Sequence, residues 1–275
     1  MMLLKGKAAI VTGSARGIGR ATAELLAAHG ARVLISDLDE QLATEAAAAI
    51  DGETAVFAGD LTKDGVCDAL VQRAVDAFGA LDIVVNNAGY TWDGMAHKMS
   101  DDQFRAMLEI HTVAPFRLLR AAAPHLREPA KREQAEGREV FRKVVNVTSI
   151  SGTQGNIGQA NYSSAKAGLV GLTKTLAREW GPVKVNVNAV AFGFVETRLT
   201  APPEEAGVFQ AGEEAIQLGI PEKMRELAPK LIPLGRPATP REAAGPILFL
   251  CSPWSNFVHG QVITASGGQT TGMTS

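Results

Sequence analysis

Short runs of β-branched residues alternate with longer stretches rich in alanine and leucine, and this alternation constrains the fold most. The runs are almost continuously hydrophobic, as expected of parallel strands that helices cover on both faces. The pattern predicts an α/β Rossmann fold with a doubly wound parallel sheet. The predicted strands are Ala8–Thr12, Arg32–Ser36, Thr54–Ala58, Asp82–Asn86, Lys143–Thr148, Val183–Val190 and Gln261–Thr264. The predicted helices are Gly17–His29, Asp39–Ile50, Thr62–Phe78, Asp101–Leu126 (with Pro115 and Pro124 as candidate breaks), Gln159–Trp180 and Pro240–Cys251.

Neither an internal repeat nor a linker divides the 275 residues, so we expect one domain spanning residues 1–275. Two segments interrupt the alternation. Arg127–Arg142 is charged and helix-prone, which predicts a surface insertion. Thr200–Pro233 carries five prolines and no predicted strand, and long segments of this kind often cover binding sites. We therefore expect a substrate-loop insertion at about residues 200–233, with further substrate walls at Tyr90–His97 and Gly152–Gly158.

Charge and cysteine usage exclude several classes of function. The chain has 27 basic and 29 acidic side chains and no basic patch, which argues against binding to nucleic acid or to an anionic membrane. Cys67 and Cys251 are far apart and have no neighbouring ligand cluster, so we expect neither a disulfide framework nor a metal site. The amino-terminal apolar stretch is too short for a signal peptide, and no run reaches the length of a membrane span. These features predict a cytoplasmic protein.

A glycine-rich turn, Thr12–Gly19, lies between the first predicted strand and the first predicted helix. Glycines there permit a tight turn and let the backbone approach a pyrophosphate, which the helix N-terminus attracts through free N–H groups. A purely structural turn is the alternative, and the position between strand and helix favours the cofactor reading. The predicted dinucleotide contacts are Gly13, Ser14, Arg16, Gly17, Ile18 and Gly19.

Asp37 ends the second predicted strand, eighteen residues after Gly19. A carboxylate there can accept both ribose hydroxyls of an adenosine and would repel a 2′-phosphate. This predicts NAD in preference to NADP. Arg16 is a counter-argument, because its guanidinium could pair with a 2′-phosphate. The structural alternative for Asp37 is to cap the next helix, which Asp39 could do instead.

Two further motifs follow strands at the carboxyl edge of the sheet, where open α/β sheets bind ligands. Asp60 and Leu61 follow the third strand and are expected at the adenine. Asn87, Ala88 and Gly89 follow the fourth strand, where small residues let the backbone approach a ligand.

Tyr162 and Lys166 share one helix face at i, i+4 spacing, and Ser149 ends the fifth strand thirteen residues before the tyrosine. A cation about 4 Å from a phenol at an effective dielectric of about 20 contributes roughly 4 kcal/mol, or about 3 pKa units. We therefore expect Lys166 to lower the pKa of Tyr162 and make it an acid/base, with the Ser149 hydroxyl on the substrate oxygen. The alternatives are a surface cation–aromatic contact and, for Ser149, a helix or turn cap.

These motifs occur in the order and spacing of the short-chain dehydrogenase/reductase family, which the chain closely resembles over essentially its whole length. The resemblance implies strand order 3-2-1-4-5-6-7 and hydride transfer between a nicotinamide and a secondary alcohol or ketone. It implies that Tyr162 is the acid/base, that Lys166 lowers its pKa and holds the nicotinamide ribose, and that Ser149 orients the carbonyl.

Two departures from the family pattern stand near the expected reaction centre. His111 replaces an asparagine that usually supports a proton-relay water, and we include it among the catalytic residues. Phe192-Gly193 replaces the usual Pro-Gly after the sixth strand. The resemblance still implies that Val195 and Thr197 contact the cofactor.

The segment Ile232–Pro237 resembles the 3-oxoacyl-(acyl carrier protein) reductase branch, which commonly uses NADPH. Asp37 counts against that role, so the primary hypothesis is an NAD(H)-dependent oxidoreductase of a fairly apolar or acyl ketone or alcohol. The alternatives are an NADPH-dependent 3-oxoacyl-(acyl carrier protein) reductase and a catalytically weak dinucleotide-binding sensor.

Family members are commonly tetramers, so the resemblance implies a homotetramer. Ala243–Ser275 contains no charged residue but includes Trp254, Phe257 and Val258. This composition suits a subunit contact, although the same residues could instead cover the chain's own last strand.

Overall fold

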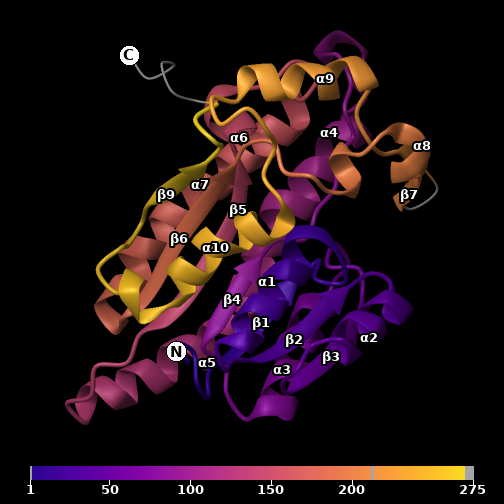
Figure 1. Ribbon diagram of the computed structural model, residues 1–275. Helices are drawn as coiled ribbons and strands as arrows, with labels where there is room; N and C mark the ends of the chain where they lie inside the picture. The colour runs from indigo at the N-terminus through magenta and orange to yellow at the C-terminus, as the bar shows by residue number, and fades with distance from the viewer. Residues whose placement is uncertain (1, 212–213, 270–275) are drawn as a thin grey trace.

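The computed structural model describes residues 2–211 and 214–269, which form the predicted α/β Rossmann fold (Figure 1). The main sheet is parallel and has the strand order β3-β2-β1-β4-β5-β6-β9, so the predicted topology is confirmed. The seventh strand along the sheet is numbered β9 because β7 and β8 form a separate hairpin. The strands are β1 (Ala8–Thr12), β2 (Arg32–Asp37), β3 (Thr54–Ala58), β4 (Ile83–Asn86), β5 (Arg142–Ser149), β6 (Val185–Phe192), β7 (Val208–Ala211), β8 (Glu214–Gln217) and β9 (Val262–Ala265).

Helices cover both faces of the sheet, because successive side chains of each strand point to opposite faces. In β1, Ile10 packs into one core with α3, α5 and α7, and Val11 packs into the other with α1, α2 and α10. The helices are α1 (Gly17–Ala28), α2 (Glu40–Ala48), α3 (Val66–Phe78), α4 (Asp101–Leu108), α5 (Ala114–Ala135), α6 (Ile150–Gln154), α7 (Ala160–Trp180), α8 (Pro203–Ala206), α9 (Glu222–Leu231) and α10 (Pro240–Cys251).

The helix predicted over Asp101–Leu126 does not break at its prolines. It runs from α4 through a π-helical segment, η2 (Glu109–Val113), directly into α5. Pro115 lies in the first turn of α5, where a missing N–H costs little, and Pro124 lies inside a helix whose apolar face is buried. Much of the predicted insertion Arg127–Arg142 is therefore the end of α5, which projects from the body in Figure 1.

The segment Thr200–Pro233 contains strands, which the sequence analysis did not predict. β7 and β8 pair antiparallel, with Phe209 opposite Ile216. Both side chains belong to a small apolar cluster with Ala206 and Leu218, and this cluster packs against Tyr90 of the main domain. The hairpin forms because this tertiary contact supports short strands with weak intrinsic propensity. Residues 212 and 213 of this segment lie outside the described residues.

Part of the apolar C-terminal segment is exposed. Trp254 is 63% exposed and Phe257 is fully exposed, whereas Ile247 and Leu250 are buried against the sheet. Residues 270–275 of the charge-free segment lie outside the described residues. Within the described ranges, helices that combine the length and apolarity needed to cross a membrane are absent.

Candidate active site

A cavity of about 1260 Å³ lies along the carboxyl edge of the sheet. It runs from the glycine-rich turn past β4 to the ends of β5 and α7, and then to the segment that contains β7 and α9. Every residue predicted at the site lines this cavity except Ser14 and Gly19. The predicted residues that line it are Gly13, Arg16, Gly17, Ile18, Asp37, Asp60, Leu61, Asn87, Ala88, Gly89, His111, Ser149, Tyr162, Lys166, Val195 and Thr197.

The glycine-rich turn packs so closely against other backbone that only glycine fits at two of its positions. A Cβ on Gly13, whose φ is +62°, would lie 2.8 Å from the Cα of Ala88. A Cβ on Gly19 would lie 2.1 Å from the carbonyl oxygen of Gly13. The N-cap of α1, Arg16, makes no side-chain cap hydrogen bond. The first N–H groups of α1 therefore remain available to a phosphate, and the turn fits a dinucleotide.

Ser14 and Gly19 hold this turn from behind. The Ser14 hydroxyl donates to the carbonyl of Val11 (2.6 Å) and accepts from the N–H of Ser36 (3.0 Å), which joins β1 to β2. Asn87 supports the other side, since its Nδ2 donates to the carbonyls of Thr12 (2.9 Å) and Gly13 (3.1 Å). These residues shape the turn through its backbone.

The two aspartates predicted to meet the adenosine both accept hydrogen bonds from loop residues. The Asp37 carboxylate accepts from the N–H of Ala15 (3.0 Å) and from the N–H of Leu38 (2.8 Å). Asp39 caps α2, so the capping role that was the structural alternative for Asp37 belongs to Asp39. Asp60 accepts from the N–H and the hydroxyl of Thr62 (2.9 and 2.6 Å). Asp37 thus joins the glycine-rich turn to the loop after β2, and Asp60 stabilises the loop that carries it.

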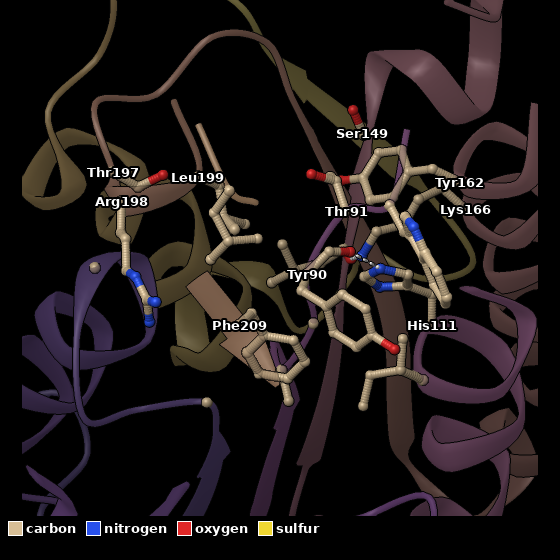
Figure 2. A pocket seen from close by; sticks show the side chains of 18 of the residues that line it. Tyr90, Thr91, His111, Ser149, Tyr162, Lys166, Thr197, Arg198, Leu199 and Phe209 are labelled. Atoms are coloured by element: carbon tan, nitrogen blue, oxygen red, sulfur yellow. Dashed lines mark hydrogen bonds between the residues drawn. The ribbon is translucent and has the colours of Figure 1, made fainter. Parts of the chain in front are cut away.

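Ser149, Tyr162 and Lys166 come together at the deep end of the cavity, where Figure 2 shows the three side chains near one another. The Ser149 hydroxyl lies near Tyr162 in Figure 2 and donates to the carbonyl of Phe192 (3.4 Å). It also accepts from the N–H of Ser151 (3.1 Å), so Ser149 caps α6. The ammonium of Lys166 lies 5.6 Å from the Tyr162 ring centroid and donates to the carbonyl of Val147 (2.8 Å). The site therefore presents a serine–tyrosine pair with a buried lysine behind it.

The electrostatics of this group differ from the expectation. Burial raises the pKa of Tyr162 to about 12, although the Ser149 hydrogen bond opposes this rise. Burial also lowers the pKa of Lys166 to about 7, because a charged amine is poorly solvated there. Burial is thus the largest cause of both shifts, and the role of Lys166 in lowering the pKa of Tyr162 stays a prediction. Tyr162 is protonated at neutral pH and can donate its proton.

His111 lies in the π-helical segment and is buried beside Tyr162, with the two rings edge to face at 5.0 Å. Its Nε2 lies 2.7 Å from the carbonyl oxygen of Tyr90, as the dashed line in Figure 2 marks. A carbonyl only accepts, so Nε2 carries the proton. Burial, and then the charge of Lys166, hold the pKa of His111 well below its usual value, so the imidazole is neutral. Gly89 makes room for this ring, since a Cβ there would lie 2.1 Å from its Cε1.

The substrate end of the cavity is largely apolar. The ring centroids of Tyr90 and Phe209 are 4.3 Å apart. This contact joins the loop that follows β4 to the hairpin of β7 and β8. In the predicted wall Tyr90–His97 the first four residues line the cavity, whereas in Gly152–Gly158 only Asn156 does so. The apolar lining of the third segment consists of Val208, Phe209, Leu218, Ile220, Met224, Leu227, Ala228 and Leu231.

Arg198 also lines the cavity and was not predicted from the sequence. Its position directly after Thr197 is the signal that could have found it, because that threonine was already expected at the cofactor. Among the described residues, groups of three or more histidine, cysteine, aspartate or glutamate side chains that could hold a metal ion are absent.

Comparison with known proteins agrees with the fold and with the arrangement of this site. The family model described as Enoyl-(Acyl carrier protein) reductase matches residues 13–270. The chain belongs to the short-chain dehydrogenase/reductase family, whose members are oxidoreductases acting on CH–OH groups with NAD(P).

Individual relatives are similar over nearly their whole length. The chain is 35% identical to the 3-oxoacyl-(acyl-carrier-protein) reductase FabG of Thermotoga maritima over 97% of this chain and 99% of the relative. It is 36% identical to the FabG of Vibrio cholerae over 97% and 98%, and 35% identical to that of Aquifex aeolicus over 96% and 98%.

These relatives overturn the predicted preference for NAD, because they belong to the reductase branch that uses NADPH. The prediction gave the Asp37 carboxylate more weight than Arg16. Asp37 lines the cavity, and its carboxylate accepts hydrogen bonds from the N–H groups of Ala15 and Leu38. Arg16, the counter-argument, lines the same cavity.

Proposed function

We propose that this protein is an NADPH-dependent reductase of 3-oxoacyl groups carried on acyl carrier protein. The observation that carries the proposal is the serine–tyrosine pair, Ser149 and Tyr162, at the end of a cavity that the glycine-rich turn opens for a dinucleotide. The similarity to 3-oxoacyl-(acyl-carrier-protein) reductases supports the choice of substrate. The apolar lining contributed by the segment 200–233 suits an acyl chain, so we assign this segment to substrate binding.

The dinucleotide supplies the hydride when bound. In the proposed chemistry the Ser149 hydroxyl orients the substrate carbonyl, and Tyr162 donates its proton to the carbonyl oxygen as the hydride reaches the carbon. A protonated tyrosine, which burial stabilises here, is the form that ketone reduction requires. Lys166 holds the nicotinamide ribose, and the remaining cofactor contacts are those predicted from the motifs.

We assign His111 a positioning role beside Tyr162. Its neutral ring packs edge to face on the tyrosine ring and ties the Tyr90 carbonyl to the site. A relay through a protonated imidazole is not part of the proposal, because burial disfavours the imidazolium.

Two expectations about the protein's environment complete the proposal. We infer a homotetramer in which the exposed Trp254 and Phe257 contribute to a subunit contact, because exposed aromatic side chains are enriched at interfaces. We also infer a reducing compartment such as the cytoplasm, in agreement with two cysteines, Cys67 and Cys251, that are buried and free.

The test is the absorbance loss of NADPH on mixing the protein with an acetoacetyl thioester of pantetheine. We expect rapid oxidation of NADPH, slower oxidation of NADH, and little turnover of a small sugar ketone. Binding of NADPH without turnover of any 3-oxoacyl thioester would favour the sensor alternative. Equal or faster turnover with NADH would contradict the assigned cofactor.

A further inference from the structure

Two consecutive residues of β5 hold both ends of Lys166. The ammonium donates to the carbonyl of Val147 (2.8 Å), and the backbone carbonyl of Lys166 accepts from the hydroxyl of Thr148 (2.9 Å). Both hydrogen bonds are buried. The strand therefore fixes the backbone and the amine of the same residue.

A second threonine holds the residue before Lys166 from the π-helical segment η2. The Thr112 hydroxyl donates to the carbonyl of Ala165 (2.8 Å). A Cβ built on Gly168 would lie 3.3 Å from the Thr112 side chain, so α7 approaches η2 closely at this point. A carbonyl oxygen has two lone pairs, so each of these carbonyls can accept a threonine hydroxyl in addition to its bond within the helix. Two neighbouring carbonyls of α7 are thus anchored to two different elements.

The place of the ammonium depends on how α7 lies against β5. A Cβ built on Gly152 of α6 would lie 2.7 Å from the Cβ of Lys166, so α6 packs directly on the lysine. The ammonium lies 5.6 Å from the ring centroid of Tyr162, which shares α7 with Lys166 (Figure 2). Its acceptor, Val147, belongs to the sheet. A shift of α7 relative to β5 would therefore change either the contact with the sheet or the contact with the tyrosine.

We propose that Thr148 and Thr112 are positioning residues for Lys166, because their hydroxyls fix α7 against β5 and η2 and so set the place of the ammonium beside Tyr162. This inference rests on the proposed function, in which Lys166 holds the nicotinamide ribose and Tyr162 donates the proton. Buried supporting hydrogen bonds of this kind hold reacting groups in their productive geometry. Thr112 does not line the cavity, so its effect on the reaction passes through α7.

The substitution Thr148→Val gives the size of the expected effect. The hydroxyl oxygen lies 2.9 Å from the carbonyl oxygen of Lys166, whereas a carbon in its place needs about 3.3–3.6 Å. The methyl group therefore displaces this carbonyl by roughly 0.5 Å. A misplacement of about 1 Å can slow a reaction about 100-fold, so half that distance predicts a loss of about tenfold in kcat.

The first experiment measures kcat and KM for reduction of the acetoacetyl thioester with NADPH. Thr148→Val and Thr112→Val should each lower kcat about tenfold and leave KM for the thioester within about threefold, because the apolar wall is unchanged. Thr148→Ser and Thr112→Ser keep the hydroxyl and should keep kcat within about threefold of the wild type. Thr112 is only partly buried, so its variants keep the test decisive if Thr148→Val folds poorly.

Thr173→Val is the matched control for a purely structural loss. Thr173 is also buried in α7, accepts from the side-chain amide of Asn146 (2.8 Å) and donates to the carbonyl of Leu169 (2.8 Å). The variant should lose at least as much stability in urea denaturation as Thr148→Val does, because the Asn146 amide is left without its acceptor. Its kcat should stay within about threefold of the wild type, since the bonds of Lys166 to β5 remain.

The second experiment compares crystal structures of the wild type, Thr148→Val and Thr148→Ser, and it needs no turnover. In Thr148→Val the backbone of α7 at Lys166 should lie about 0.5 Å farther from β5 than in the wild type. In Thr148→Ser it should keep the wild-type position.

Three results would overturn the inference: equal kcat in Thr148→Val and Thr173→Val, serine variants as slow as the valine variants, or an undisplaced α7 in Thr148→Val. Failure of the proposed function would be distinct. The wild type itself would then oxidise no NADPH with a 3-oxoacyl thioester, while the crystal structures would still test the placement of Lys166.

Discussion

Replacing the buried Lys166 by methionine should stabilise the fold at pH 6 while it removes activity. The folded-state pKa of Lys166 falls from 10.5 to about 7. At about 1.4 kcal/mol per pKa unit, keeping this amine charged in the folded state costs up to about 5 kcal/mol below pH 7. Methionine has a similar shape and no charge. It loses the hydrogen bond to the Val147 carbonyl, which offsets about 1–3 kcal/mol. The net gain at pH 6 is therefore up to about 2–4 kcal/mol.

The sign of this effect depends on pH. Between about pH 7 and 10.5 the unfolded chain keeps the Lys166 proton and the folded chain does not, so wild-type stability rises with pH in this window. The advantage of Lys166→Met should shrink as pH rises from 7, and by pH 10 the lost hydrogen bond should make the variant the less stable protein.

Urea denaturation at pH 6, 8 and 10, at fixed protein concentration, measures this difference. Lys143→Met is the comparison variant, because burial lowers the pKa of Lys143 less, to about 8, and its ammonium donates to Asn186, Ser255 and Asn256. That variant should be less stable than the wild type, since two buried acceptors and one partly buried acceptor lose their donor. A Lys166→Met protein that is less stable at pH 6, or a difference independent of pH, would refute the reasoning.

Two further substitutions test contacts within the site. Gly89→Ala places a Cβ 2.1 Å from the Cε1 of His111, so we expect the ring and the neighbouring Tyr162 to be displaced. Urea denaturation should show a loss of about 1–3 kcal/mol in stability. Unchanged stability and activity would contradict the packing described. Phe209→Ala removes the ring contact with Tyr90, which contributes about 0.5–1.5 kcal/mol. The substitution should raise KM for a 3-oxoacyl thioester about three- to tenfold and leave NADPH affinity unchanged. An unaltered KM would exclude Phe209 from the substrate wall.

The sequence predicts the main sheet well because its strands are buried on both faces and are therefore continuously apolar. β1 and β3 have the predicted bounds. β6 begins at Val185 rather than Val183, since Lys184 adopts a left-handed conformation (φ +59°) that the apolar sequence around it does not reveal.

The hairpin of β7 and β8 could not be predicted in the same way. Its strands have four residues each and carry exposed polar side chains, and the surrounding segment is rich in proline. The apolar cluster with Tyr90 supports them, and that contact joins positions more than a hundred residues apart.

The candidate site follows from motif order, but its electrostatics do not. The motifs place Ser149, Tyr162 and Lys166 at one edge of the sheet, and the structure brings them together there. The calculation from sequence counted the attraction between lysine and phenol, whereas the desolvation of both groups depends on the surrounding fold. The hydrogen bonds of Asp37 likewise could not be predicted from the sequence, since one donor is the N–H of Ala15 in a different loop.

The central claim is that Tyr162 donates the proton in NADPH-dependent reduction of a 3-oxoacyl thioester. The most direct measurement compares the wild type with Tyr162→Phe, following NADPH oxidation with the acetoacetyl thioester and NADPH affinity by titration. We predict that kcat falls by a factor of about 10²–10⁴ while the Kd for NADPH changes less than about threefold. A variant that retains wild-type turnover would contradict the account.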